Sequence, residues 1–561
     1  MSESERNQEQ GGGNQPRARI PRQIGFIIGN EACERFSFYG MRNILTQFLV
    51  ASALLGVATQ ADREIMTKEI FHIFVIGVYF FPLLGGWLAD RRWGKYKTIL
   101  WLSLVYCAGN ACLAIFAGDI FVSPEQVAAL QAAGGSLDQE ITRQVAIGVD
   151  PGSRWGFYLG LLLISLGSGG IKPCVSAFVG EQFDQSNKHL AKVVFDAFYW
   201  IINFGSFFAS LLIPLVLQSW GPRWAFGIPG ALMFVATVVF WLGRGRYVRE
   251  QPTPGDPHSF GKVCWTALSS SGTGKSMFIA GIVAALGCGL LPVVTEVVDV
   301  VAGICLAVLF FATFTGIGAW LNLDQARSQH QEEDVEGAKA VFRVLILFAL
   351  VTPFWSLFDQ KASTWVLQGN TMTLPDWSWF KQATQMQALN PLLVMILIPF
   401  NNTVLFPLFK KMGWELTQLR KMTLGIGIAG LSWVLIGWYQ LRLDGGEQLS
   451  VLLQAWPYLI LTCGEVLVSA TGLEFAYSQA PMKMKSVIMS FWMLTVTTGQ
   501  VWVLIVNSTV KSQAVTDAIA ATGFGVTAFQ MFFFAGFAII CAIGFGLYAR
   551  KYKTMDYYRQ G

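Results

Sequence analysis

Residues 70–117 read IFHIFVIGVYFFPLLGGWLADRRWGKYKTILWLSLVYCAGNACLAIFA. Two apolar runs, 70–89 and 97–117, flank a short junction that carries Asp90 and several basic residues. A run of about 18 or more apolar residues is long enough to cross the hydrocarbon core of a bilayer as a helix. This stretch therefore predicts two membrane-spanning helices joined by a charged loop.

The rest of the 561-residue chain repeats this pattern. Apolar residues make up 53% of the chain and charged residues only 13%, whereas about 25% of the residues of soluble domains are charged. The composition predicts an all-α polytopic membrane protein with about fourteen transmembrane helices. The other twelve spans are expected at 24–56, 155–177, 195–218, 224–243, 277–294, 299–322, 340–367, 382–409, 421–440, 456–478, 486–508 and 526–549.

The charges of the loops predict the orientation of the chain. If the spans alternate in direction, loops with basic residues such as Arg22, Lys95 and Arg550 fall on one side, and acidic residues such as Asp119 and Glu125 fall on the other. Basic loops stay in the cytoplasm. We therefore expect a multi-pass protein of the cell (inner) membrane with both termini in the cytoplasm.

The spans form groups of six, two and six. The junction Gly86-Trp-Leu-Ala-Asp90-Arg91, followed by Gly94-Lys95, resembles the loop signature G-x-L-x-D-R-x-x-G-R/K of the major facilitator superfamily. The resemblance implies a major facilitator fold, with two six-helix bundles and, here, two extra central helices. The expected divisions are a cytoplasmic tail at 1–22, an N-terminal bundle at 23–243, a link with the extra helices at 244–339, a C-terminal bundle at 340–550, and a second tail at 551–561.

The first span carries four charged residues. Glu31, Arg35 and Arg42 fall on one face of a helix, Glu34 lies beside them, and Glu31 and Arg35 are four residues apart. Each charge at the middle of a bilayer costs about 2.5–3.5 kcal/mol on insertion scales. This helix must therefore face charged partners or a wet cavity, unless the charges only form a salt-bridge cluster at the helix end.

Glu31-x-x-Glu34-Arg35-Phe-x-Phe38-Tyr39-Gly40 resembles the E-x-x-E-R-F-x-Y-Y-G motif of the proton-dependent oligopeptide transporter family. The resemblance implies proton coupling through the two glutamates and Arg35, and binding of a peptide carboxylate by Arg42. Tyr39 retains one tyrosine of the motif. Phe38 replaces the other, so a hydroxyl contact is lost there.

Further motifs in the first half carry the same resemblance. Gly167-Ser-Gly-Gly-Ile-Lys172-Pro173 is similar to G-x-G-G-I-K-P, and the stretch from Phe195 to Ser206 is similar to F-x-x-F/Y-Y-x-x-x-N-x-G-S. Lys172 needs a counter-charge in a membrane, which we expect from the first-span glutamates or from a substrate carboxylate, unless it snorkels to water. The resemblance implies substrate contacts or proton transfer at four further residues, which are His72, Tyr79, Tyr199 and Asn203. A lone histidine such as His72 is equally typical of a structural hydrogen-bonder.

Motifs in the second half resemble the family's F-W-x-L-F/Y-D/E-Q, Q-x-x-N-P and G-E-x-x-x-S stretches. Asp359 is an acidic residue inside a span, and its expected partner is Arg42 in a gating salt bridge. Glu465 is the expected counter-ion for a peptide ammonium. The remaining predicted substrate contacts are Trp355, Asn390, Ser469 and Trp492. Lys361, beside Asp359, is unusual for the motif.

The resemblance covers nearly the whole chain and implies proton-coupled symport of di- and tripeptides by alternating access. The expected partners are the peptide, protons and the lipid bilayer, with no nucleic acid, and the proton gradient drives transport without a cofactor. The sequence shows no nucleophile–base pair or metal cluster, so neither catalytic nor metal-binding residues are expected. Two alternatives are uptake of another small solute, such as nitrate or an organic anion, and a non-transporting membrane sensor.

Overall fold

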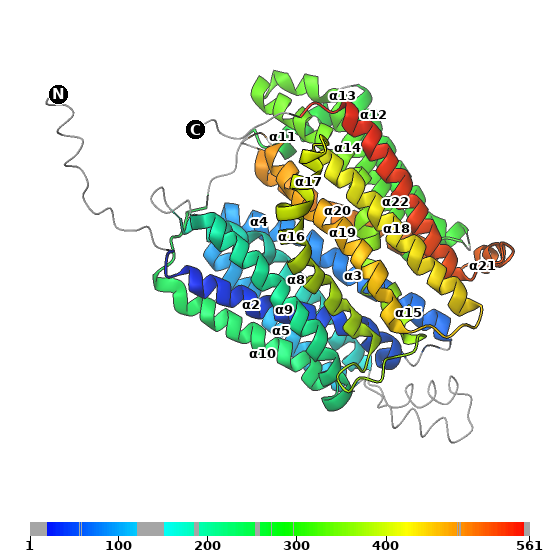
Figure 1. Cartoon of the computed structure of the whole chain (residues 1–561). Coiled ribbons are helices and arrows are strands. Elements are labelled where there is room, and N and C mark those ends of the chain that lie inside the picture. The colour runs from blue at the N-terminus through cyan, green and yellow to red at the C-terminus, as the bar shows by residue number, and fades with distance from the viewer. Residues whose placement is uncertain are drawn as a thin grey trace.

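The computed structural model describes residues 20–54, 57, 59–119, 151–183, 190–252, 258–270, 272–295, 297–479, 481 and 484–554. Long helices pack side by side throughout this part of the chain, and no β-sheet occurs in it (Figure 1). The expected all-α polytopic fold is confirmed. The predicted tail residues 1–19 and 555–561, and Glu125 in its loop, lie outside the described residues.

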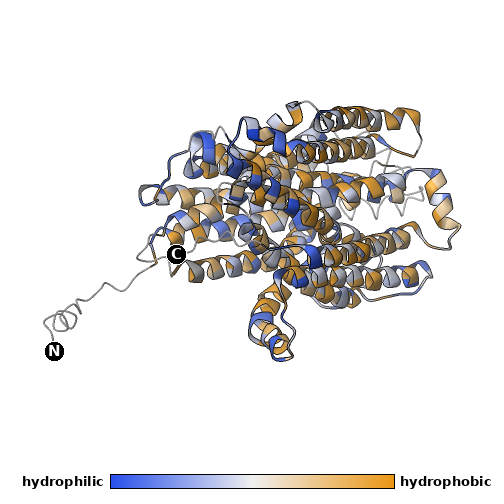
Figure 2. Cartoon of the chain, turned by 90° about the horizontal axis from the view of Figure 1, so that it is seen from above, coloured by the Kyte–Doolittle hydropathy of each residue, from blue (hydrophilic) through white to orange (hydrophobic). Residues whose placement is uncertain are grey.

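Thirteen helical stretches in the described residues are long and apolar enough to cross a membrane. Helix α2, Ile24–Phe48, is 25 residues long but carries the four charges of the first predicted span. Since α2 packs among the spanning helices, it supplies the fourteenth span that the sequence predicts. Figure 2 shows apolar residues along the helices and hydrophilic residues most densely on the side of the two termini.

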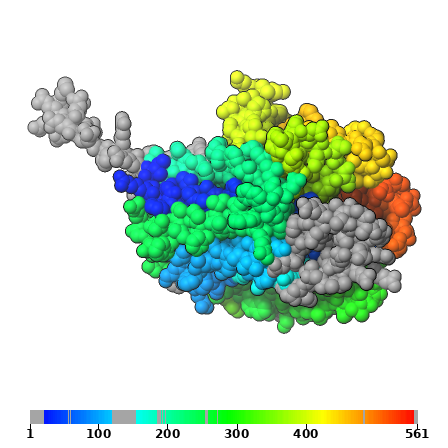
Figure 3. Space-filling view, turned by 90° about the horizontal axis from the view of Figure 1, so that it is seen from below, coloured from blue at the N-terminus to red at the C-terminus, as the bar shows by residue number. Residues whose placement is uncertain are grey.

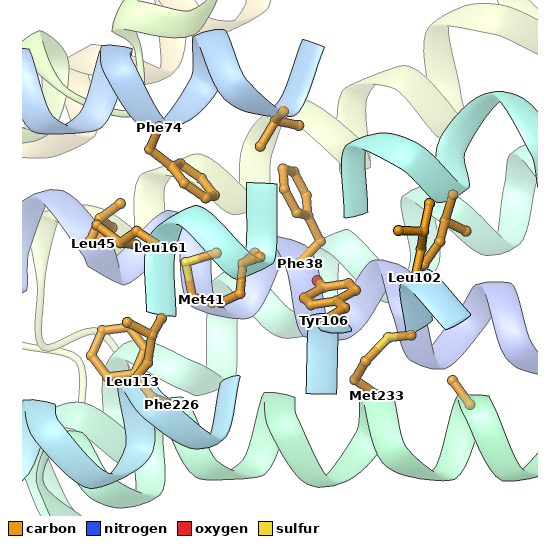
Figure 4. Packing of buried hydrophobic residues seen from close by; sticks show 14 of the residues in the cluster. Phe38, Met41, Leu45, Phe74, Leu102, Tyr106, Leu113, Leu161, Phe226 and Met233 are labelled. Carbon is orange, nitrogen blue, oxygen red and sulfur yellow. The ribbon is translucent and has the colours of Figure 1, made fainter. Parts of the chain in front are cut away.

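The first six spanning helices pack together. Helix α2 contacts α9 and α10, while α5 contacts α8 and α10. Figure 4 shows part of the apolar core between them, where the ring of Phe38 stacks on that of Phe74 at 6.4 Å. The helices after α2 are α3 (Gln60–Phe80) with α4 (Pro82–Leu88), α5 (Lys95–Asp119), α8 (Pro151–Glu181), α9 (Ala191–Trp220) and α10 (Pro222–Leu242).

The last six spans form a second group. Helix α14 contacts α20 and α22, and α18 contacts α19 and α22. In Figure 3 the surfaces of the two groups lie on opposite sides of the face seen from below. The elements are α14 (Glu332–Gln360) with α15 (Thr364–Asn370), η6 (Ala383–Ala388) with α16 (Leu389–Phe400) and α17 (Phe406–Lys411), α18 (Gln418–Asp444), α19 (Ala455–Ser478), α20 (Lys485–Thr509), the short α21 (Gln513–Ala520), and α22 (Val526–Lys551).

Two extra spanning helices form a hairpin between the groups in sequence. Helices α12 (Thr273–Val294) and α13 (Val300–Asn322) follow the short α11 (Phe260–Ser269), and α13 rests against α20. Only Gly274 and Gly281 are buried on α12. Most of its surface is therefore free to face lipid.

Several helices extend beyond the apolar runs that predict them. Helix α3 begins at Gln60 rather than near 70, and α14 begins at Glu332 rather than near 340. Thr59 caps α3, because its side chain accepts a hydrogen bond from the backbone N–H of Asp62. Polar turns of this kind can lie outside the hydrocarbon core, so a search for apolar runs misses them.

Polar contacts between the two groups lie at the level of Arg42 and between Arg42 and the C-terminal end of α2 and beyond it. They therefore lie in the half of the molecule opposite to the start of α2. Thr46 Oγ1 donates to the carbonyl of Ala362 at 2.6 Å, and Asn507 Nδ2 donates to the carbonyl of Ile65 at 3.1 Å. At this end α3 packs on α20 and α9 packs on η6. The two groups are thus joined at the end far from the termini.

Candidate functional site

A cavity of 190 Å³ lies between the two groups of helices. Helices α2, α3 and α9 supply one wall, and α14, α16 and α19 supply the other. Eight of the predicted substrate contacts line it: Tyr39, Arg42, Tyr79, Asn203, Trp355, Asn390, Glu465 and Ser469. Lys172, Tyr199 and Trp492 are not among the lining residues. The sequence motifs therefore converge on one site, and their functional roles stay predictions.

The acidic cluster of α2 is buried beside the cavity. Arg35 Nε lies 2.5 Å from Glu31 Oε1 and 3.2 Å from Glu34 Oε2, and both glutamates are buried. Ser168 Oγ donates to Glu34 Oε1 at 3.3 Å. One guanidinium is therefore shared by two carboxylates, so protonation of either glutamate would still leave Arg35 with a partner.

Arg42 and Asp359 connect the two walls. Arg42 Nη2 donates to Asp359 Oδ1 at 2.5 Å, and Gln500 Nε2 donates to Asp359 Oδ2 at 2.7 Å. His72 Nδ1 lies 2.6 Å from Gln500 Oε1, and its Nε2 lies 3.0 Å from Ser363 Oγ. Since Gln500 uses its amide N–H on Asp359, its oxygen must accept from His72, which assigns the proton of the neutral ring to Nδ1. His72 thus supports Asp359 through Gln500.

Lys172 does not contact the first-span glutamates, contrary to one expectation from the sequence. Its Nζ lies 4.0 Å from the centroid of the Phe38 ring and 4.8 Å from that of the Tyr79 ring, and no described acidic side chain is within 4 Å. Aromatic faces attract cations through the ring quadrupole. The residue that replaces the motif's tyrosine, Phe38, therefore holds the ammonium next to the cavity wall, where a substrate carboxylate remains the expected counter-ion.

Glycines of the α8 motif allow the close helix contacts that place Lys172. A Cβ on Gly169 would lie 2.7 Å from the carbonyl oxygen of Val78 on α3, and one on Gly167 would lie 2.7 Å from the backbone nitrogen of Tyr106 on α5. These distances are shorter than van der Waals contact. Glycine is therefore required for α8 to approach α3 and α5, as the motif predicts.

The opposite wall holds an acid, an amide and a lysine. Asn390 Nδ2 donates to Glu465 Oε2 at 2.5 Å and to Thr462 Oγ1 at 3.1 Å. Its Oδ1 accepts from Lys361 Nζ at 2.8 Å. The amide of Asn390 therefore bridges the carboxylate of Glu465 and the ammonium of Lys361. No described cation lies within 4 Å of the Glu465 carboxylate.

Aromatic residues close one side of the cavity. Trp355 lines it, and Trp492 stands behind with its ring centroid 6.1 Å from that of Trp355 in an edge-to-face arrangement. Tyr199 is 42% exposed on α9, one turn before Asn203. Trp492 and Tyr199 therefore lie outside the site in this structure, although both were predicted as contacts. The sequence does not show that Trp355 stands between Trp492 and the cavity, because that depends on how the helices pack.

Three contacts of the site could not be read from a motif. Gln500, Lys361 and Thr462 each bind a predicted residue from a distant part of the chain. The available signal is a polar side chain inside an otherwise apolar span, which marks Gln500 on α20 and Thr462 on α19.

A larger groove, of 1130 Å³, lies elsewhere, between α18, α19 and α22, and contains none of the predicted site residues. Its lining includes Arg420 and Arg550 near the helix ends, together with apolar side chains such as Leu547. We place the candidate site in the smaller of these two cavities, because it gathers buried charges of both signs, with Arg42 from the first group of helices and Asp359 and Lys361 from the second. No group of three potential metal ligands occurs among the described residues.

Comparisons with known proteins agree with this architecture. The family model PTR2, described as the POT family, matches residues 96–525. The crystal structure of an auto-inhibited POT family peptide transporter is 55% identical, with a TM-score of 0.84, covering 96% of this chain and 99% of that one. The POT family transporter PepTSo is also 55% identical, with a TM-score of 0.85, covering 96% of this chain and all of that one.

Curated relatives are more distant in sequence. Solute carrier family 15 member 1 of Rattus norvegicus is 32% identical over 432 residues, which are 76% of this chain and 52% of that protein. The chain thus spans about half the length of this relative. The family model covers most of the chain, and two solved transporters share more than half of its residues over nearly its whole length, so the chain belongs to the POT family.

Proposed function

We propose that the protein is a proton-coupled symporter of di- and tripeptides that works by alternating access. The proton gradient drives it, and no cofactor takes part. Its family and the chemistry of its cavity both support this proposal. The solved structures that it resembles are those of an auto-inhibited POT family peptide transporter and of the POT family transporter PepTSo.

The single observation that carries the proposal is the distribution of charge in the cavity. Arg42 lies on the wall formed by the first six spans, and Glu465 with Asn390 lies on the wall formed by the last six. A short peptide is a zwitterion with a carboxylate at one end and an ammonium at the other. It can therefore bridge the two walls, while Trp355 and Phe358 offer apolar surface for side chains. A simple anion has no group to pair with Glu465.

Transport requires that the contacts between the walls break. A peptide carboxylate that binds Arg42 competes with Asp359 for the same guanidinium. Protonation of Glu31 or Glu34 removes one of the two carboxylates that hold Arg35. The first event weakens a contact between the walls, whereas the second changes the charge of a cluster that lies wholly on α2. Each can drive the change only if the peptide or the proton binds one state more tightly than the other.

We infer that residues 23–243 and 340–550 act as the two moving bundles, in a multi-pass protein of the cell (inner) membrane with both termini in the cytoplasm. Arg22, Lys95 and Arg550 on the side of the termini support that orientation. In this orientation, the end where α3 packs on α20 faces away from the cytoplasm. Its opening would admit substrate from outside.

Uptake of a labelled dipeptide into proteoliposomes tests the proposal. The purified chain should accumulate the peptide when the outside is acidic, and a protonophore should abolish accumulation without abolishing exchange. Labelled nitrate, offered under the same gradient, should not accumulate. Peptide uptake that is equal with and without the proton gradient would overturn the proposed proton coupling. Uptake of nitrate but not of the dipeptide would overturn the proposed substrate class.

A further inference from the structure

Lys361 is a buried ammonium in the wall of the cavity. It follows the last residue of α14 and is 4% exposed. Its Nζ lies 3.2 Å from the centroid of the Phe358 ring and donates to Asn390 Oδ1 at 2.8 Å. The ammonium is thus surrounded by an aromatic face and an amide oxygen, and both of these residues also line the cavity.

The partner of Lys361 belongs to the subsite that the proposed function assigns to the peptide's amino terminus. Asn390 holds Glu465 with its amide nitrogen and Lys361 with its amide oxygen. The orientation of this amide follows from its neighbours, because a carboxylate can only accept and an ammonium can only donate. The cavity therefore contains a carboxylate, an amide and an ammonium in one connected group.

A peptide amino terminus has the same chemistry as the end of a lysine side chain. Each is a –NH₃⁺ group with three donors and no acceptor, so both suit Asn390 Oδ1 and the field of Glu465. Two unpaired ammonium groups at one subsite also repel each other, and this repulsion is strong where water is scarce. Hence the side chain of Lys361 and a peptide ammonium compete for this place.

We propose that Lys361 is an internal occupant of the amine subsite, a tethered ammonium that must leave Asn390 before the amino terminus of a peptide can bind there. The inference rests on the proposed function and makes Lys361 a specificity-determining residue. A peptide with a free amino terminus brings the charge that replaces Lys361 beside Glu465. A peptide with an acetylated amino terminus brings no such charge and leaves Lys361 in place.

A purely structural role for Lys361 predicts a different outcome. Its carbonyl oxygen accepts from the hydroxyl of Tyr458 at 3.4 Å, and its side chain holds Asn390. If Lys361 only keeps the wall in shape, removing its charge should weaken the binding of every peptide. If it competes with the substrate, removing its charge should strengthen the binding of free-amino peptides alone.

The experiment measures the dissociation constants of dialanine and N-acetyl-dialanine for the full-length purified chain. The variants are Lys361→Met and the more polar Lys361→Gln, which also serves if the methionine variant does not fold. Lys361→Arg keeps a cation, and Lys411→Met removes an exposed lysine outside the cavity. Removal of the competitor should lower the dissociation constant for dialanine at least about fivefold, the low end of usual coupling between binding events. The constant for N-acetyl-dialanine should not fall, and Lys361→Arg and Lys411→Met should behave like the wild type.

Two results would overturn the inference. Weaker binding of both peptides by Lys361→Met and Lys361→Gln would show a structural role, and an unchanged ratio of the two constants would show no competition. Failure of the proposed function is distinguishable, because the wild-type chain would then bind neither peptide.

Discussion

Arg42 Nη2 and Asp359 Oδ1 lie 2.5 Å apart, in side chains that join α2 to α14 and are almost completely buried. Removing one partner of a buried ion pair costs about 3–5 kcal/mol. The cost of removing one partner is the penalty of a buried charge left without a counter-ion. The bundles can therefore separate at this point only if another anion, such as a peptide carboxylate, takes the place of Asp359 on Arg42.

The hydrogen-bonded side chains of His72, Gln500 and Asp359 should affect transport as one unit. We expect His72→Leu and Gln500→Leu each to reduce gradient-driven uptake, because each removes a hydrogen bond that reaches Asp359 directly or through one residue. The double variant should be little worse than either single variant, with an interaction energy of about 0.5–3 kcal/mol. Thr509→Val is a control on the same helix, since its hydroxyl bonds only the carbonyl of Val506. Rate losses that multiply in the double variant would contradict a shared path.

Substitution of Glu34 should abolish proton-driven accumulation of peptide without abolishing peptide exchange. Glu34→Gln keeps the size of the side chain but removes the charge that lies 3.2 Å from Arg35. We expect this variant to exchange labelled peptide with pre-loaded vesicles, since the cavity is intact, and to lose accumulation under a proton gradient. Glu415→Gln, at an exposed glutamate, is the matched control. Accumulation at the wild-type level by Glu34→Gln would remove this residue from the coupling step.

Two glycines of helix α8 offer a matched test of helix packing. A Cβ on Gly169 would lie 2.7 Å from the backbone oxygen of Val78, whereas a Cβ on Gly180 would meet nothing within 4 Å. Gly169→Ala should therefore push α8 away from α3 and destabilise the protein by about 1–3 kcal/mol. Gly180→Ala should be neutral or stabilising, by up to about 1 kcal/mol, because alanine favours a helix. Thermal unfolding in detergent measures both, and equal melting temperatures would contradict the close contact.

The sequence predicts what depends on hydropathy and charge. The spans follow from apolar runs, and the need of Arg42 and Asp359 for counter-ions follows from the cost of a lone charge in a membrane. Their pairing with each other is expected from the motifs that resemble those of the family. The sequence does not predict which of several partners a charge selects. Lys172 contacts two aromatic rings instead of the glutamates, and Lys361 binds Asn390, which lies 29 residues later in the sequence. Those choices depend on the distances between packed helices, which no spacing in the chain records.

Lys511 joins three parts of the molecule at the end where the bundles meet. Its Nζ lies 2.5 Å from Glu69 Oε1 on α3 and 2.6 Å from Asp299 Oδ2, while Asp299 Oδ1 caps the first turn of α13. The extra hairpin is thereby tied to the contact between α3 and α20. Burial alone would raise the pKa of Asp299, but the N–H of Ala302 and the ammonium of Lys511 outweigh it and hold this pKa below its ordinary value. Burial alone would lower the pKa of Lys511, but Asp299 and Glu69 outweigh it and raise this pKa.

Lys511→Met should therefore destabilise the protein in a pH-dependent way. The raised pKa of Lys511 contributes stability below its unfolded value, about 10.4, and the contribution is lost as the pH rises through the folded value. The lowered pKa of Asp299 contributes stability above its unfolded value, about 3.9, and the contribution is lost as the pH falls through the folded value.

The two partly exposed pairs are together worth roughly 0.4–2 kcal/mol. The melting temperature of the wild type should thus exceed that of Lys511→Met most between about pH 5 and 9, and the gap should shrink in strong acid and base. Lys411→Met, at a lysine outside this contact, should show no such gap, and a gap for Lys511→Met that stays constant with pH would mean that lost packing, not charge, destabilises the variant.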